Sequence, residues 1–182
     1  MRAIPGMVVL SPADAVETEK MVFAAAEYEG PVYVRLGRLN IPVLFDENYK
    51  FEIGKAATLK EGNDVAILAT GLMVSEALEA AKLLEEKGVK ARVVNVSTIK
   101  PLDKETVLKA AKECKFIVTS EEHSVIGGLG SAVSEYLSEV HPTKVVKHGI
   151  QDIFGQSADG ETMLTNYGLR AKDIAEIVFK NI

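Results

Sequence analysis

The sequence contains one cysteine, no tryptophan and no long hydrophobic run among its 182 residues. The single cysteine, Cys114, excludes an internal disulfide and a thiolate metal cluster, and it favours a reducing compartment. It lies between a helix signal and a buried-strand signal, so we expect a small core residue rather than a reactive thiol. The apolar runs reach roughly six residues, whereas a membrane span needs ~20, and no secretion signal opens the chain. These absences predict a cytoplasmic protein without a membrane partner.

Positive charge is also scarce, because 21 Lys and Arg stand against 26 Asp and Glu, for a net charge of −5. Binding to nucleic acid requires a basic face, so we expect no nucleic-acid partner. The chain does have 47% hydrophobic and 26% charged residues, which is typical of a soluble globular protein. Its length allows one ordinary domain, or one domain plus a fragment.

The first 42 residues predict a single βαβ unit. Met7–Leu10 is a short buried-strand signal, and Ser11 is expected to cap the helix that follows and stops at Gly30. Val32–Leu36 is the second strand, and a polar turn follows it. One βαβ unit cannot bury both faces of its strands. The rest of this chain, or another chain, must therefore cover it.

Residues 43–63 have no sustained period and are expected to form a linker, with one short strand near Phe51–Thr58. From 64 to 182, apolar strands alternate with amphipathic helices. The expected strands are 65–69, 91–96, 116–119 and 144–147. The first two expected helices lie between Gly71 and Gly88 and from the cap Asp103 to 113. The others run from the turn that contains Gly127, Gly128 and Gly130 to 138, and over 160–167 and 171–180. This order predicts an α/β fold, doubly wound with a mainly parallel sheet and preceded by the partial βαβ unit.

Three glycines, Gly127, Gly128 and Gly130, separate the strand at 116–119 from the next helix. A strand, a tight turn and a helix in this order present backbone N–H groups at a helix N-terminus, which favours an anion or partner site. The other interpretation is close helix–strand packing that only glycine permits. The fingerprints G-x-G-x-x-G and G-x-x-x-x-G-K-[ST] are both absent, so packing is the favoured interpretation.

The longer stretch Glu121–Val133 resembles a segment of the C-terminal domain of transketolases, with similar versions in deoxyxylulose-phosphate synthases and in β subunits of 2-oxoacid dehydrogenases. Arg2–Met7 and Ser11–Glu17 resemble the second half of the transketolase pyrimidine-binding domain, and Gly30–Arg38 resembles its last strand and turn. The resemblance implies a partial pyrimidine-binding domain at 1–42 and a C-terminal domain at 64–182. It also implies a dimeric transferase that moves two-carbon ketol units between sugar phosphates in the pentose phosphate pathway.

The cofactor of this family is thiamine diphosphate with a divalent metal (Mg), bound between a pyrophosphate domain and the pyrimidine domain of another subunit. This sequence has no Gly-Asp-Gly…Asn motif, and it begins after the part that would hold the acid activating the aminopyrimidine ring. We expect Glu17 and Glu19 to be ordinary helix carboxylates. The resemblance thus implies that an N-terminal portion of the enzyme is the partner. The isolated chain is expected to contain no catalytic residue, to bind no cofactor or metal, and to be inactive.

Arg38 is the residue to which the resemblance assigns the phosphate of the sugar phosphate. A guanidinium on a turn at the carboxyl end of a strand matches phosphate oxygens; the alternative is a surface pair with Asp46 or Glu47. Arg35 lies within the strand and is expected to pair with a carboxylate across an interface rather than to bind a ligand. His123 titrates near neutral pH, but no serine–histidine–acid order accompanies it, so we expect a hydrogen-bonded structural histidine.

The remaining polar groups predict no further site. Glu121, Glu122, His123 and His148 are not spaced as metal ligands, and the loop at Gln151–Gly155 is expected to be an interface or lid. Two other functions remain open: a β-type piece of a 2-oxoacid dehydrogenase E1 component, and a non-catalytic module whose glycine turn holds an anion or supports oligomerisation. Arg38 and the closing Leu164–Leu169 favour transketolase.

Overall fold

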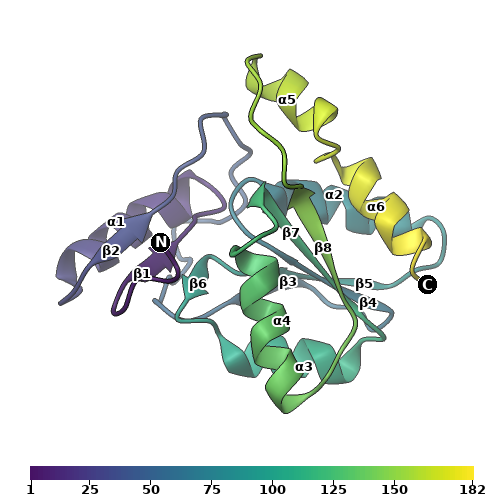
Figure 1. Ribbon diagram of the computed structural model, residues 1–182, viewed down its shortest axis with the longest axis horizontal. Helices are drawn as coiled ribbons and strands as arrows, with labels where there is room; N and C mark the ends of the chain where they lie inside the picture. Colours follow the sequence, from purple (N-terminus) through teal and green to yellow (C-terminus); the bar gives the residue numbers. More distant parts are fainter.

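Two β-sheets organise the chain, and the computed structural model describes all of residues 1–182 (Figure 1). The smaller sheet has the order β2-β1-β6, with strands β1 (Val8–Leu10), β2 (Val32–Val34) and β6 (Thr98–Lys100). The larger sheet has the order β3-β5-β4-β7-β8, with strands β3 (Ala57–Lys60), β4 (Val65–Ala69), β5 (Ala91–Asn95), β7 (Ile117–Ser124) and β8 (Val145–Ile150). We call the larger sheet and the helices packed on it the main domain, and β1, α1 (Ala15–Glu27) and β2 the N-terminal unit.

The main domain confirms the α/β fold with a mainly parallel sheet. Strands β5, β4, β7 and β8 are parallel, and only the edge strand β3 runs antiparallel, beside β5. Alternate residues of β4 face opposite layers: Val65, Ile67 and Ala69 join a core with helices α2 (Met73–Glu85) and α6 (Ala171–Phe179). Ala66 and Leu68 join a second core with α3 (Lys104–Glu113) and α4 (Leu129–Val140). The fold is therefore doubly wound, with helices on both faces (Figure 1).

Local capping signals set the helix starts, with one correction to the sequence analysis. Asp103 caps α3 as predicted, accepting a hydrogen bond from the backbone N–H of Thr106 at 3.0 Å. Helix α1, however, begins after Asp14, whose carboxylate accepts the backbone N–H of Glu17 at 2.7 Å. The prediction that Ser11 caps this helix is wrong. It was made because a serine followed by a proline is typical of an N-cap and a first helical turn. The backbone N–H of Ser11 instead bonds the carbonyl of Ser97.

The N-terminal unit is attached to the main domain by a strand that the sequence analysis did not predict. β6 follows β5 directly and pairs antiparallel with β1, while β2 pairs parallel with β1 on the other side. Part of the chain itself thus covers the unit. The short strand expected near Phe51–Thr58 lies at Ala57–Lys60, where it pairs with β5.

The strands β7 and β8 both continue beyond their predicted ends. β7 runs through the polar residues Glu121 and Glu122 to Ser124, and β8 includes His148, which the sequence analysis placed in a loop. Polar residues are unusual in a buried strand, but here their side chains find partners inside the protein. After β8 the chain forms the short helix α5 (Gly160–Asn166) and then α6. No helix has the length and apolar character needed to cross a membrane.

Candidate functional site

Arg38 lies on the turn that follows β2, and its side chain is exposed. It forms none of the ion pairs or side-chain hydrogen bonds of the structure, so neither Asp46 nor Glu47 pairs with it. The turn lies beside a surface hollow bordered by Leu36, Gly37 and the start of α1. The guanidinium is therefore free to bind an anion.

Arg35 is engaged, in contrast, by a carboxylate of the main domain. Its Nη2 donates to the backbone carbonyl of Glu122 on β7 and lies 3.6 Å from the Glu122 carboxylate. The expected partner across an interface is thus Glu122, which joins the end of β2 to the carboxyl end of β7. Both side chains are about one-quarter exposed, at 27% and 29%, so water screens the pair only in part.

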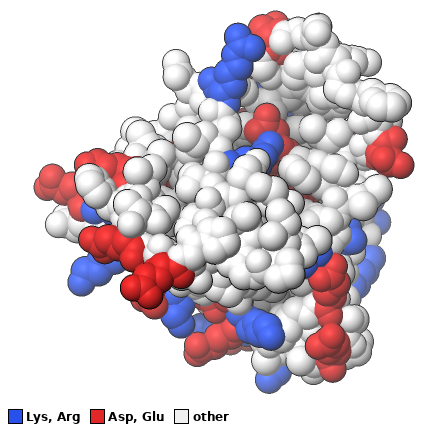
Figure 2. Space-filling view, turned by 60° about the vertical axis from the view of Figure 1, so that its left-hand side comes forward, with Lys and Arg blue, Asp and Glu red and all other residues white.

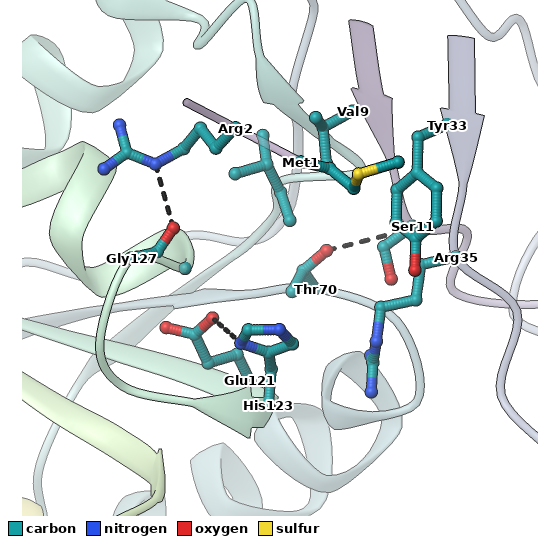
Figure 3. A pocket seen from close by; sticks show the side chains of 12 residues that line it. Met1, Arg2, Val9, Ser11, Tyr33, Arg35, Thr70, Glu121, His123 and Gly127 are labelled. Atoms are coloured by element: carbon teal, nitrogen blue, oxygen red, sulfur yellow. Dashed lines mark hydrogen bonds and ion pairs between the residues drawn. The ribbon is translucent and has the colours of Figure 1, made fainter. Parts of the chain in front are cut away.

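A small cavity of about 100 Å³ lies between the N-terminal unit and β7 (Figure 3). Tyr33 and Arg35 border it from one side, and Glu121 and His123 border it from β7. The Nδ1–H of His123 donates to the carbonyl of Ser124 at 2.8 Å, and the ring lies 4.0 Å from the Glu121 carboxylate. This half-exposed histidine is thus hydrogen-bonded to the backbone of its own strand.

Glu121 fills the helix N-terminus that the glycine turn creates. Its carboxylate accepts the backbone N–H groups of Leu129 and Gly130, both at 2.8 Å, at the start of α4. Burial raises the pKa of the Glu121 carboxyl, while these two hydrogen bonds and the nearby His123 and Arg35 lower it in part. An internal carboxylate therefore takes the place that an external anion would occupy.

The glycines allow this close approach. A Cβ atom on Gly128 would lie 1.9 Å from Oε2 of Glu121, and one on Gly130 would lie 2.7 Å from the Thr119 hydroxyl. Gly127 adopts φ +78°, a conformation that other residues rarely adopt. These contacts favour the packing interpretation of the turn.

Glu17 is a buried polar residue that the sequence analysis missed, and its description as an ordinary helix carboxylate is wrong. It is fully buried, and it accepts hydrogen bonds from the backbone of Ala13 at 2.7 Å, the Tyr49 hydroxyl at 2.8 Å and the Asn95 amide at 2.9 Å. Burial beside this carboxylate raises the pKa of Tyr49. Glu19 is exposed, as expected. The overlooked signal is helical spacing, because Glu17 lies four residues before the buried Met21.

Asp14 extends this buried cluster to the segment after the Arg38 turn. Its Oδ2 accepts the backbone N–H groups of Leu44 and Phe45 at 2.7 and 2.8 Å. Together with the bonds of Glu17 to Tyr49 and Asn95, these contacts tie α1, residues 44–49 and β5 into one unit. The cluster serves to join the N-terminal unit to the main domain.

The other polar candidates also have structural partners. His148 is buried; its Nε2–H donates to the carbonyl of Gly168 at 2.8 Å, and its Nδ1 accepts the Ser120 hydroxyl at 2.9 Å. Burial lowers the pKa of His148 below its usual 6.5. Cys114 is buried, which raises its thiol pKa. No three His, Cys, Asp or Glu side chains are grouped so that they could hold a metal ion.

The loop at Gln151–Gly155 is open to solvent and exposes two large apolar side chains. Phe154 is 97% exposed and Ile153 is 57% exposed. The hydroxyl of Tyr167 accepts the backbone N–H of Gln156 at 3.0 Å and holds the base of this loop.

Comparison with known proteins assigns both parts of the chain to one family. Residues 54–174 match the family model of the transketolase C-terminal domain, and residues 1–43 match that of the transketolase pyrimidine binding domain. Among curated relatives, a protein of Methanocaldococcus jannaschii, provisionally named a transketolase C-terminal section, is 43% identical over 100% of this chain and 58% of its own length.

Two further relatives are named as transketolase subunits. A 6-deoxy-6-sulfo-D-fructose transketolase subunit of a Clostridium species is 45% identical, over 96% of this chain and 54% of its own length. An apulose-4-phosphate transketolase subunit of Phocaeicola vulgatus is 42% identical, over 97% of this chain and 56% of its own length. The chain thus spans little more than half the length of these curated relatives.

Two solved structures share the fold across nearly the whole chain. One, described as a split gene transketolase in an inactive beta4 tetramer, has a TM-score of 0.95 and 51% identity, over 99% of this chain and 59% of that chain. A transketolase mutant from Pichia stipitis has a TM-score of 0.76 and 27% identity, over 98% of this chain and 25% of that chain.

Proposed function

Because this chain belongs to the transketolase family, we propose that it forms the C-terminal section of an enzyme that transfers two-carbon ketol units between sugar phosphates. Its relatives include subunits named for different sugars, so the family membership by itself leaves the substrate open. The order of the two matched regions, a pyrimidine-binding part followed by a C-terminal domain, supports a role inside a larger assembly. The particular sugars depend on residues around the substrate.

The observation that carries the proposal is the exposed, unpaired Arg38. Its neighbour Arg35 is occupied by Glu122, so Arg38 is the free guanidinium of the turn that follows β2. A charge-assisted hydrogen bond to phosphate contributes about 1.5–3 kcal/mol, which corresponds to a roughly 10- to 100-fold change in affinity. The role of Arg38 is to hold the phosphate end of the sugar.

The residues of this chain do not fit a site for thiamine diphosphate and its metal. Magnesium is usually held by one or two free carboxylates together with phosphate oxygens and water, and no three His, Cys, Asp or Glu side chains of this chain are grouped for a metal. The buried carboxylates of Asp14, Glu17 and Glu121 are each occupied by backbone or side-chain donors. We therefore assign cofactor binding to the N-terminal portion of the enzyme, the proposed partner of this chain.

The surface of the N-terminal unit supports such a partner. Helix α1 exposes Val22 and Phe23, which are 50% and 65% accessible. Figure 2 turns this side of the molecule forward, and its central area is formed largely by residues other than Lys, Arg, Asp and Glu. Uncharged, partly apolar surface of this kind is typical of protein interfaces. The chain works in the cytoplasm as part of a dimeric or larger assembly.

The test is reconstitution from separately expressed parts. The chain is titrated calorimetrically with thiamine diphosphate and magnesium and assayed for ketol transfer, with and without the N-terminal portion. We expect neither saturable cofactor binding nor turnover by the chain alone, and activity on sugar phosphates after mixing. Turnover by the lone chain would contradict the assignment of the cofactor site. A mixture that acts on 2-oxoacids, and not on sugar phosphates, would favour the dehydrogenase β-type alternative.

A further inference from the structure

We propose that Glu122 and Gly160 are positioning residues through which the main domain sets the orientation of the Arg38 turn. This inference rests on the proposed phosphate-binding role of Arg38. Two independent contacts, one on each side of Arg38, carry it. Neither contact involves Arg38 itself, so each can be altered without removing the proposed ligand group.

The first contact fixes the chain before Arg38. The guanidinium of Arg35 donates a hydrogen bond to the backbone carbonyl of Glu122 on β7 and forms an ion pair with the Glu122 carboxylate. A Cβ atom on Gly37 would lie 4.0 Å from Oε2 of Glu122 and 4.0 Å from a methyl group of Leu72. The Glu122 carboxylate therefore lies against the turn as well as against Arg35.

The second contact fixes the chain after Arg38. Leu39 lies directly over Gly160, the first residue of α5, because a Cβ atom on Gly160 would lie 2.4 Å from Cδ2 and 2.7 Å from Cγ of Leu39. Leu39 and Ile41 also pack against the core formed with α2 and α6. A side chain at position 160 would force the Leu39 side chain to shift, and so would disturb the contact that holds this side of the turn.

Arg38 thus projects into solvent from a backbone that the main domain holds on both sides. Holding a binding group in position matters because a displacement of about 1 Å can cost up to roughly 100-fold in rate. Fixing the turn before the ligand arrives also removes an ordering cost from binding. The main domain in this way controls the affinity for the phosphate end of the substrate, although it supplies no phosphate ligand.

Substitutions of Arg35 and Glu122 distinguish an effect on the position of the turn from a purely electrostatic effect on phosphate binding. Glu122→Gln removes a negative charge near the turn and leaves Arg35 with only its hydrogen bond to the Glu122 backbone carbonyl, so electrostatics alone predicts tighter phosphate binding. Arg35→Gln leaves an unpaired carboxylate there, so electrostatics alone predicts weaker binding. Positioning predicts weaker binding from both substitutions, since each weakens the connection between the chain after β2 and β7, and it predicts the larger effect from Arg35→Gln.

NMR relaxation of the backbone amides of the full chain tests the structural half of the proposal without any activity. We expect lower amide order parameters at residues 36–41 in Glu122→Gln and in Gly160→Ala. The matched controls are Glu139→Gln, on the exposed end of α4, and Gly155→Ala, where an added Cβ atom meets nothing within 4 Å. Unchanged order parameters at 36–41 in both variants would overturn the proposal, whatever the function of Arg38.

Kinetics of the reconstituted enzyme test the functional half. We expect Glu122→Gln and Gly160→Ala to raise KM for a phosphorylated sugar by ~3- to 30-fold, with kcat and the KM of the unphosphorylated analogue nearly unchanged. Glu122→Asp, which keeps the charge, should restore part of the loss. If Arg38→Ala raises KM but the two positioning variants do not, positioning is wrong and the proposed function stands. If Arg38→Ala itself changes nothing, the proposed function fails and the inference with it.

Discussion

The carboxylate of Glu121 accepts the backbone N–H of Gly130 at 2.8 Å, across the first turn of α4. The helix N-terminus is thus neutralised by a residue of the preceding strand, which explains why a glycine-rich turn that follows a parallel strand need not bind an external anion. This glycine turn joins β7 to α4. The proposed phosphate-binding residue, Arg38, lies on a different turn, the one after β2.

Replacement of Glu121 should destabilise the fold. In Glu121→Ala the buried N–H groups of Leu129 and Gly130 lose their acceptor, and each buried donor left unpaired costs about 1–3 kcal/mol. We expect a lower free energy of unfolding in urea, whereas Glu139→Ala, on the exposed surface of the same helix, should change it by less than about 0.5 kcal/mol. Equal effects of the two substitutions would show that the cap contributes nothing.

Glu17 should contribute far more to stability than Glu19, although both are carboxylates of α1. Glu17→Ala removes the acceptor of the Tyr49 hydroxyl, the Asn95 amide and the Ala13 backbone, and each buried donor left unpaired costs about 1–3 kcal/mol. Glu19→Ala removes an exposed side chain and serves as the control. Urea unfolding of the two variants measures the difference, and a difference below about 1 kcal/mol would contradict the role given to Glu17.

His148 should make stability dependent on pH below neutrality. Its pKa is lowered in the folded state from the usual 6.5, because burial disfavours the imidazolium. The unfolded chain therefore binds a proton first as the pH falls, and stability that is fully present above pH 6.5 is lost on the way down to the lowered pKa. The slope is at most about 1.4 kcal/mol per pH unit for one proton.

The variant His148→Gln provides the comparison for this pH dependence. We expect the free energy of unfolding of the unsubstituted chain to fall faster than that of His148→Gln between pH 6.5 and about 5. The exposed His123 and the half-buried His141 remain in both proteins. Parallel curves for the two proteins over this range would show that His148 is not held neutral by the fold.

The exposed apolar residues of α1 should cause the isolated chain to self-associate. Val22 and Phe23 lie on the accessible face of the helix, and a stable interface buries near 1,600 Å². An interface of this size should hold at roughly tens of micromolar protein. We therefore expect sedimentation at this concentration to show a dimer or a larger species. Phe23→Glu should shift it toward the monomer. A clean monomer before substitution would contradict this expectation.

Local signals explain why much of the fold could be predicted from the sequence. The order of strands and helices in the main domain follows from hydrophobic periodicity, and Asp103 caps α3 because a cap acts within its own turn. The strand β6 could not be predicted, because its three residues are a strand only by pairing with β1. The burial of Glu17 depends likewise on Tyr49 and Asn95, which are distant in sequence.

The candidate site, like the fold, could be predicted from the sequence only in part. The position of Arg38 on a turn after a strand follows from local sequence and from the resemblance. Its freedom from Asp46 and Glu47, and the contacts of its neighbours with Glu122 and Gly160, depend on how the N-terminal unit packs on the main domain. The extension of β7 through Glu121 and Glu122 was missed for this reason too, since their partners come from α4 and from Arg35, directly after β2.

The most direct test of the account is the substrate preference of Arg38→Ala in the reconstituted enzyme. Measured as kcat/KM, activity on a phosphorylated acceptor should fall by about 10- to 100-fold, and activity on the unphosphorylated analogue should stay within about twofold. Arg38→Lys should retain part of the preference, because lysine keeps the charge without the planar fork, and Lys50→Ala is the exposed control. An equal loss on both acceptors, or no loss on either, would contradict the phosphate-binding role of Arg38.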